Sequence, residues 1–279
     1  MPRLIDTHAH LNLEAYDVDR RQVIENARAS GVFMINVGVN YASSLRALEI
    51  AQEYGDGIWA AIGLHPESIE DDYNPHAKEF RNPEDAKEAG FDYELYCGLA
   101  RSSDKVVAIG EAGLDYLHSP KDKIAAAWIR DKQAEVFKRQ LVLARELGLP
   151  VIIHTRMAHE DTLGILRGFA GLGGNVNGVI HCFTGSADEM RQYRDLGLYF
   201  GITGIIFKLD LNEAIVRMPL DHILLETDCP FLSPVPGVKR NEPKFVLNVA
   251  ERVAQIRSDS VDAIIKAATE NAKRLFKIG

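Results

Sequence analysis

Two histidines close to the start of the chain, His8 and His10, are the first residues whose type and spacing indicate chemistry. They follow a short, mainly apolar run, Leu4–Asp6. If this run is a strand that continues through His10, its period of two places both imidazoles on one face, where they can bind one metal ion. A His-x-His pair also arises by chance, so other parts of the chain must supply the remaining ligands.

Further residues of ligand type stand where other apolar runs of the chain end. They are Glu111, His154, His181 and Asp228. Together with the first pair they amount to four imidazoles and two carboxylates, which can hold two divalent ions if they meet at one place, with a carboxylate as a bridge. The pattern therefore predicts a two-metal site.

The elements that must position these residues repeat along the chain as a short apolar run followed by a longer amphipathic stretch. The predicted strands are Leu4–Asp6, Phe33–Val37, Ile58–Ile62, Val106–Ile109, Val151–Ile153, Gly178–Ile180, Tyr199–Ile202 and Ile223–Leu225. The predicted helices are Asp19–Ser30, Ser43–Tyr54, Asp85–Arg101, Ile124–Leu147, His159–Phe169, Ala187–Leu196, Leu211–Arg217, Lys244–Arg257 and Val261–Phe276. Apolar strands that alternate with helices favour an α/β fold, a closed (β/α)8 TIM barrel whose reacting groups lie at the carboxyl ends of the strands.

An open doubly wound sheet is the alternative, but the chain lacks the Gly-rich phosphate turn of such folds. Gly168–Gly174 is rich in glycine, yet it precedes a strand and lacks the P-loop lysine, so we interpret it as a loop. No linker rich in proline or serine divides residues 1–279, which favours a single domain. The connection 67–105, between the third and fourth strands, is long. This connection either covers the site or is a solvated insertion with only a structural role, and the sequence does not distinguish the two.

The composition is that of a globular chain, with 46% hydrophobic and 26% charged residues among 279. The net charge of −8 argues against broad electrostatic adhesion to nucleic acid. No segment has the apolar length of a signal peptide or a membrane helix, so we expect a cytoplasmic protein without membrane contact. The cysteines, three in number, lack CxxC spacing and are expected to be reduced. Strand alternation predicts that Cys182 and Cys229 point away from the metals, toward the helices.

Seven segments of the chain also carry a resemblance to a known family. They are DTHAHL (Asp6–Leu11), GLHP (Gly63–Pro66), GEAGLDY (Gly110–Tyr116), PVIIHTR (Pro150–Arg156), GVIHCFTG (Gly178–Gly185), LLETDCPFL (Leu224–Leu232) and NAKRLF (Asn271–Phe276). These motifs resemble the successive signatures of the TatD family of metal-dependent hydrolases, from the first strand to the last helix. The 67–105 connection is longer than the usual span of that family.

The resemblance implies a TIM-barrel metallohydrolase of the amidohydrolase superfamily, with deoxyribonuclease activity. It implies DNA as the substrate, single-stranded or at an end, and no obligate protein partner. It also implies the same six metal ligands as the strand-end argument. We expect His8 and His10 to bind one ion, His154 and His181 the other, and Glu111 to bridge. Zinc, manganese, nickel and magnesium are the candidate ions; imidazole ligands suit magnesium least.

Hydrolysis of a phosphodiester by metal-activated water is the mechanism that fits these ligands. Asp228 is the expected acceptor of the water's proton, with Glu111 as the second catalytic carboxylate. Contacts to the substrate are expected from His65, Arg156, Tyr116 and Asn241. Each of these also has a structural interpretation, which is packing at the mouth, a surface ion pair, a rim residue or a turn, respectively.

Two other reactions use the same site and remain open. One is hydrolysis of a small cyclic amide or lactone, because a fold does not determine a substrate. The other is hydrolysis of the ester of an aminoacyl-tRNA. A nucleic-acid-binding module without catalysis is disfavoured, because binding does not require six strand-end ligands and the chain lacks an extended basic stripe.

Overall fold

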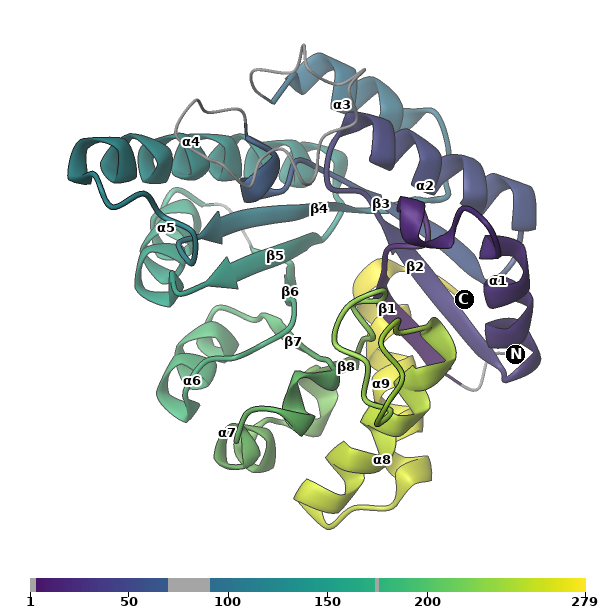
Figure 1. The fold of residues 1–279 in the computed structure, drawn as a ribbon. Coiled ribbons are helices and arrows are strands. Elements are labelled where there is room, and N and C mark those ends of the chain that lie inside the picture. Colours follow the sequence, from purple (N-terminus) through teal and green to yellow (C-terminus); the bar gives the residue numbers. More distant parts are fainter. Residues whose placement is uncertain (1–3, 70–90, 174–175) are drawn as a thin grey trace.

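Eight parallel strands follow one another in chain order around one sheet in the structure, a computed structural model that describes residues 4–69, 91–173 and 176–279 (Figure 1). The strands are β1 (Leu4–Ala9), β2 (Val32–Val37), β3 (Ile58–Ile62), β4 (Val106–Asp115), β5 (Val151–Arg156), β6 (Gly178–Ile180), β7 (Tyr199–Ile202) and β8 (Ile223–Leu225). The barrel closes where Ala9 pairs with Cys229 and where the Asp228 N–H donates to the His8 carbonyl at 2.9 Å. The predicted (β/α)8 barrel is confirmed.

Helices connect the strands and cover the outside of the barrel (Figure 1). They are α1 (Arg20–Ala29), α2 (Tyr41–Tyr54), α3 (Tyr93–Arg101), α4 (Lys123–Leu147), α5 (His159–Gly171), α6 (Ala187–Asp195), α7 (Asn212–Arg217), α8 (Val246–Arg257) and α9 (Val261–Phe276). Polar side chains fix their starts: Asp122 accepts the Ala125 N–H at the start of α4, and Ser186 accepts the Glu189 N–H at the start of α6.

The buried side chains form two clusters. The larger one packs the helices against the outer face of the sheet. The smaller one joins side chains of β1 to β6 and β8, such as Ile5, Val37 and Ile152, with Ala272 and Phe276 of α9. Because successive strand residues point to opposite faces, this alternation fills the barrel with apolar side chains below the level of the polar strand ends. The core thereby fixes the strand ends that carry the predicted ligands.

Several bounds differ from the predictions. Strands β1 and β5 run past their predicted ends, to Ala9 and Arg156. Gly168 is not in a loop, because α5 continues to Gly171 and tolerates glycine on its surface. Strand β4 extends six residues beyond Ile109, to Asp115, through a register shift against β5.

Helix α3 ends at Arg101 as predicted but begins only at Tyr93, where Asp92 accepts the Leu95 N–H, so Phe91 and Asp92 are not helical, contrary to the prediction. Residues 85–90 of the predicted helix, with most of the 67–105 connection, lie outside the described residues. Among the helices described, none is both long and apolar enough to cross a membrane.

Candidate metal centre

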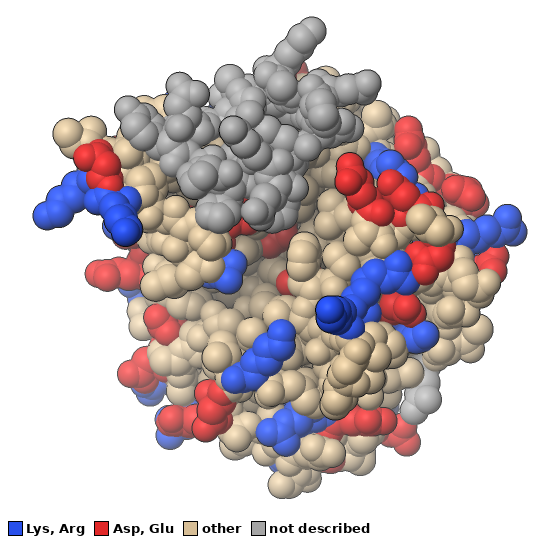
Figure 2. Space-filling model, viewed as in Figure 1, with Lys and Arg blue, Asp and Glu red and all other residues tan. Residues whose placement is uncertain are grey.

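The carboxyl ends of the strands surround a cavity of about 350 Å³. Figure 2 shows this face hollowed near its centre, with basic side chains beside the hollow. The residues that line the cavity are His10, Leu13, Val39, His65, Glu67, Glu111, Asp115, His154, Thr155, Arg156, His181, Cys182, Thr184, Ile205, Asp228, Phe231 and Leu232. Five of the six predicted ligands are among them, and the sixth, His8, is fully buried directly behind.

The first group of donor atoms comes from β1, from β4 and from the loop after β8. His8 Nε2 lies 3.0 Å from His10 Nε2 and 3.3 Å from Glu111 Oε2, and His10 Nε2 lies 3.4 Å from Asp228 Oδ1. His10 Nδ1 donates to the Val37 carbonyl at 2.9 Å, so the neutral ring has its lone pair on Nε2, toward the group. Two imidazoles and a carboxylate within reach of one point are a donor set that suits a divalent transition-metal ion.

The second group lies around the other histidines, and buried carboxylates orient its rings. His154 Nε2 donates to Asp115 Oδ2 at 2.8 Å, and His181 Nδ1 donates to Glu226 Oε2 at 2.8 Å. A carboxylate only accepts, so each contact places the ring proton on that nitrogen. The opposite nitrogens face Glu111 Oε1: His154 Nδ1 donates a hydrogen bond to it at 2.7 Å, and His181 Nε2 lies 3.8 Å from it. This is the carboxylate–histidine arrangement that orients metal ligands.

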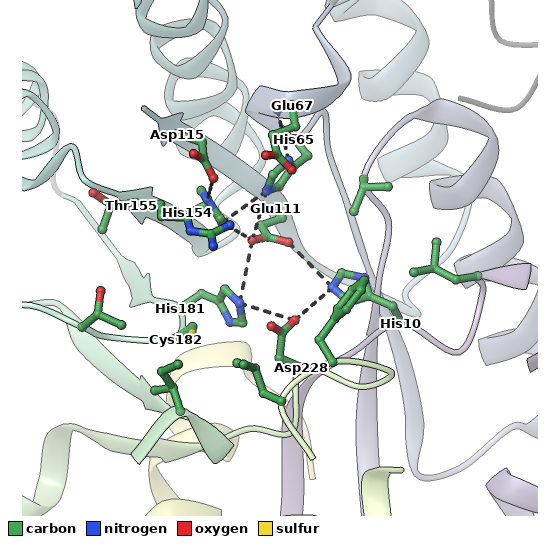
Figure 3. A pocket seen from close by; sticks show the side chains of 17 residues that line it. His10, His65, Glu67, Glu111, Asp115, His154, Thr155, His181, Cys182 and Asp228 are labelled. Atoms are coloured by element: carbon green, nitrogen blue, oxygen red, sulfur yellow. Dashed lines mark hydrogen bonds and ion pairs between the residues drawn. The ribbon is translucent and has the colours of Figure 1, made fainter. Parts of the chain in front are cut away.

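Glu111 lies between the two groups, with Oε2 toward the β1 pair and Oε1 toward His154 and His181 (Figure 3). Burial opposes its ionisation, but the surrounding imidazoles outweigh burial and lower the pKa of Glu111 well below its usual range. Partial burial opposes the ionisation of Asp228 too, but contacts with the histidines outweigh it and lower the pKa of Asp228. Both carboxylates are therefore charged at neutral pH and can bind cations.

The buried environment shifts the pKa values of His8 and His154 in opposite directions. Burial lowers the pKa of His8 to about 4. Burial also opposes the charged form of His154, but hydrogen bonds to Asp115 and Glu111 outweigh it and raise the pKa of His154 to about 10. His8 Nδ1 is buried and makes no hydrogen bond within the residues described. A neutral His8 next to ionised carboxylates is ready to bind a metal without losing a proton.

Comparisons with known proteins agree with this geometry. The family model described as "TatD related DNase" matches residues 5–277. The chain belongs to the TatD family. It is 41% identical to the uncharacterized metal-dependent hydrolase YabD of Bacillus subtilis (strain 168), over 99% of each chain. It is 34% identical to the 3'-5' ssDNA/RNA exonuclease TatD of Erwinia tasmaniensis, over 99% of this chain and 100% of the relative.

The fold agrees with that of solved structures. The crystal structure of the TatD homologue YJJV from Escherichia coli K12 superposes with a TM-score of 0.82 at 27% identity, and 99% of each chain is covered. A phosphotriesterase homology protein from Escherichia coli has a TM-score of 0.62 at 18% identity, a likeness of fold alone. This TatD-family chain is thus a metal-dependent hydrolase with a TIM barrel.

Two of the residues predicted to contact substrate line the cavity. His65 follows β3, and its Nδ1 accepts the Glu67 N–H at 3.1 Å. That contact places the proton of the neutral ring on Nε2, which lies 3.2 Å from His154 Nδ1. Arg156 is the last residue of β5 and is exposed. Both side chains are therefore placed to reach a substrate in the cavity.

The other two predicted contacts lie outside the cavity wall. Tyr116 is half-buried, its hydroxyl donates to Asp161 Oδ2 at 2.8 Å, and the guanidinium of Arg130 lies over its ring. Asn241 is fully buried and donates to the carbonyls of Thr227 and Phe231, at 2.8 and 2.7 Å. Asn241 therefore orders the loop after β8 from beneath it.

The prediction that both cysteines near the ligands point away from the metals is correct for Cys229 and wrong for Cys182. Cys229 is fully buried, whereas the Cys182 thiol lines the cavity and lies 3.1 Å from Thr203 Oγ1. The backbone of Cys182 has a φ of 44°, so the strand has already ended and the alternation of faces no longer applies.

Sequence reasoning missed the two carboxylates that orient the histidines. One signal in the sequence points to Glu226, its spacing of two residues from the predicted ligand Asp228. The structure places Glu226 directly after the end of β8, at Leu225. Asp115 lies four residues after Glu111, beyond the predicted end of the strand. Only the extension of β4 to Asp115 shows that it faces the same cavity.

A third buried carboxylate, Asp6, connects the two ends of the site. It accepts hydrogen bonds from the Thr227 N–H at 2.9 Å, the Thr227 hydroxyl at 2.6 Å and the His8 N–H at 3.2 Å. Burial raises the pKa of Asp6 to about 8. These contacts hold the start of the β8 loop against β1, so His8 and Asp228 keep a fixed separation.

Proposed function

We propose that this protein hydrolyses phosphodiester bonds of single-stranded nucleic acid, starting from an end, with two divalent ions in the cavity. The observation that carries the proposal is the position of Glu111, whose two oxygens face two different pairs of histidines. The names of several relatives, 3'-5' ssDNA/RNA exonucleases, support nucleic acid as the substrate.

The six predicted ligands divide naturally between two ions. His8 and His10 would hold the first, with Glu111 Oε2 and Asp228 nearby. Glu111 Oε1, His154 Nδ1 and His181 Nε2 would hold the second. When bound, a pair of divalent ions lowers the pKa of a water molecule and stabilises charge on the phosphoryl oxygens. Zinc, manganese and nickel fit the imidazole-rich donors better than magnesium does.

The protein's own groups supply the remaining steps. Asp228 is ionised and 16% exposed, so its carboxylate can accept a proton from a water in the cavity and pass it to the leaving oxygen. Arg156 supplies a guanidinium at the cavity edge, a geometry that suits a phosphate. His65 Nε2 lies 3.5 Å from Glu111 Oε1, so its N–H can donate to a substrate oxygen that binds beside this carboxylate.

The test is an assay of the purified, metal-analysed protein on single-stranded DNA and RNA labelled at the 3′ or the 5′ end. Lactones, dihydropyrimidines and aminoacyl-tRNA are assayed in parallel. The expected result is stepwise shortening of the oligonucleotides, which requires metal and is lost in His181→Ala. Intact oligonucleotides, together with turnover of a carbonyl substrate, would contradict the proposal and favour an amidohydrolase or an aminoacyl-tRNA ester hydrolase.

A further inference from the structure

The cavity has an apolar wall that the proposed chemistry does not use. Phe231 lies in the loop after β8, and its ring centroid is 6.4 Å from that of His10, with the rings at 70°. Leu13, Ile205 and Leu232 also line the cavity. Phe231 thus presents an aromatic side chain beside the first group of donor atoms.

The polar wall is on the other side of the centre. His10 and His154 lie on opposite sides of Glu111 (Figure 3). Arg156 follows His154 by two residues on β5, whereas Phe231 packs against His10. A ligand bound at Glu111 would therefore have the Arg156 guanidinium on one side and the Phe231 ring on the other. These surroundings suit a molecule with an anionic part and a flat apolar part.

The backbone of Phe231 is held in place although its ring is exposed. Its N–H donates to the Asp228 carbonyl at 2.9 Å, and its carbonyl accepts from the buried Asn241 amide at 2.7 Å. The side chain is nevertheless 46% exposed. An aromatic residue with a fixed backbone loses little conformational entropy when a ligand stacks on it.

Exposure alone does not distinguish this residue, because isolated surface phenylalanines are common. Phe207, at the end of the short 3-10 helix η4 (Gly204–Phe207), is also 46% exposed but does not line the cavity. The difference between the two is position: Phe231 contacts a predicted metal ligand and Phe207 does not. Phe207 is therefore a matched control.

We infer that Phe231 forms a nucleobase subsite, on which the base of the nucleotide at the scissile phosphodiester stacks. This inference rests on the proposed function and adds to it where the base binds. Stacking is tolerant of base identity, because every base has a π-face. The subsite should therefore accept all four bases and discriminate only against nucleotides without a base.

The experiment compares Phe231→Ala, Phe231→Trp and Phe207→Ala with the wild type. The substrates are single-stranded oligonucleotides that end in a normal nucleotide or in a tetrahydrofuran abasic residue, at the 3′ or the 5′ end. Loss of one stacking contact corresponds to a rise in KM of about 5- to 150-fold. We expect this rise in Phe231→Ala on normal ends, with no change on abasic ends, recovery in Phe231→Trp, and wild-type values for Phe207→Ala.

Three results would overturn the inference, and they are distinguishable. Equal losses on normal and abasic ends would show that Phe231 supports the Asp228 loop and not a base. Unchanged KM in Phe231→Ala, with oligonucleotides still hydrolysed, would remove the subsite but keep the nuclease. A wild-type protein that hydrolyses no oligonucleotide would refute the proposed function itself. Thermal unfolding of each variant shows whether the fold is kept.

Discussion

Glu226 provides the sharpest test of how the second group of ligands is organised. It is fully buried, and its Oε2 accepts both the His181 Nδ1–H at 2.8 Å and the Cys182 N–H at 3.1 Å. We predict that Glu226→Gln weakens binding of one metal ion and leaves the other ion in place. The reason is that the substitution changes the partner of His181 without removing a ligand.

The structure sets the size of this effect. A glutamine carbonyl can replace Oε2 as the acceptor. The new NH2 would replace Oε1, which accepts from the Thr7 hydroxyl at 3.3 Å; that hydroxyl can instead donate to the Leu225 carbonyl at 3.4 Å and accept from the NH2. The fold should therefore be kept. A hydrogen bond to a charged group contributes about 1.5–3 kcal/mol and a neutral one about 0.5–1.5 kcal/mol, a difference near 1–1.5 kcal/mol. Since about 1.4 kcal/mol is tenfold in affinity, we expect roughly tenfold weaker binding of the ion at His181. This is the low end of the roughly 10- to 100-fold loss typical when a carboxylate that orients a metal ligand is replaced.

The assay is equilibrium dialysis against buffered metal concentrations, followed by elemental analysis, so that the two binding constants are resolved. Glu53→Gln removes the same charge from the exposed surface of α2 and is the matched control. Wild-type affinity at both positions would show that Glu226 does not orient His181. Equal weakening at both positions, with the fold intact by circular dichroism, would refute the separation of the site into two groups.

Three further predictions follow from the same geometry. Asp228→Asn should reduce kcat by about 10²- to 10⁴-fold with an unchanged melting temperature, because a proton acceptor is lost; near-normal kcat would exclude Asp228 as the base. Gly201→Ala should reduce metal occupancy at His181 without altering a ligand, because a Cβ at Gly201 would lie 2.2 Å from the Glu226 carboxylate; full occupancy by elemental analysis would contradict this. Removal of metal by a chelator should lower stability, since an ion at 100 times its Kd contributes about 2.7 kcal/mol; denaturant titration with and without chelator measures it, and equal stabilities would show that no ion binds the native site.

The barrel and the convergence of the six predicted ligands could be read from the sequence because both depend on short-range patterns. Strands buried on both faces require continuous apolar runs, and parallel strands place their carboxyl ends at one edge. The predicted bounds of β3, β6, β7 and β8 agree with the structure. His8 and His10 meet at 3.0 Å because the period of two is a local property of the strand.

Other features depend on distances between residues far apart in the chain. Asp115 meets His154 across 39 residues, and Glu226 meets His181 across 45. Strand alternation also failed for Cys182, because a positive φ turns the backbone immediately after His181. Neither the extension of β4 nor this turn has a signal in local apolar periodicity.

By itself, the sequence determined the kind of protein, a (β/α)8 barrel with imidazoles and carboxylates at the strand ends, because burial and strand period act on neighbouring residues. Tertiary structure decided which ring nitrogen of each histidine faces the metal site. It also decided which polar groups line the cavity and which instead hold the surrounding loops in place. Asn241 and Phe231 illustrate the difference: the fold buries the polar side chain under the loop and leaves the apolar one exposed in the cavity. The physical reason is that proton positions and side-chain directions follow from hydrogen-bond partners, and those partners come together only when the barrel closes.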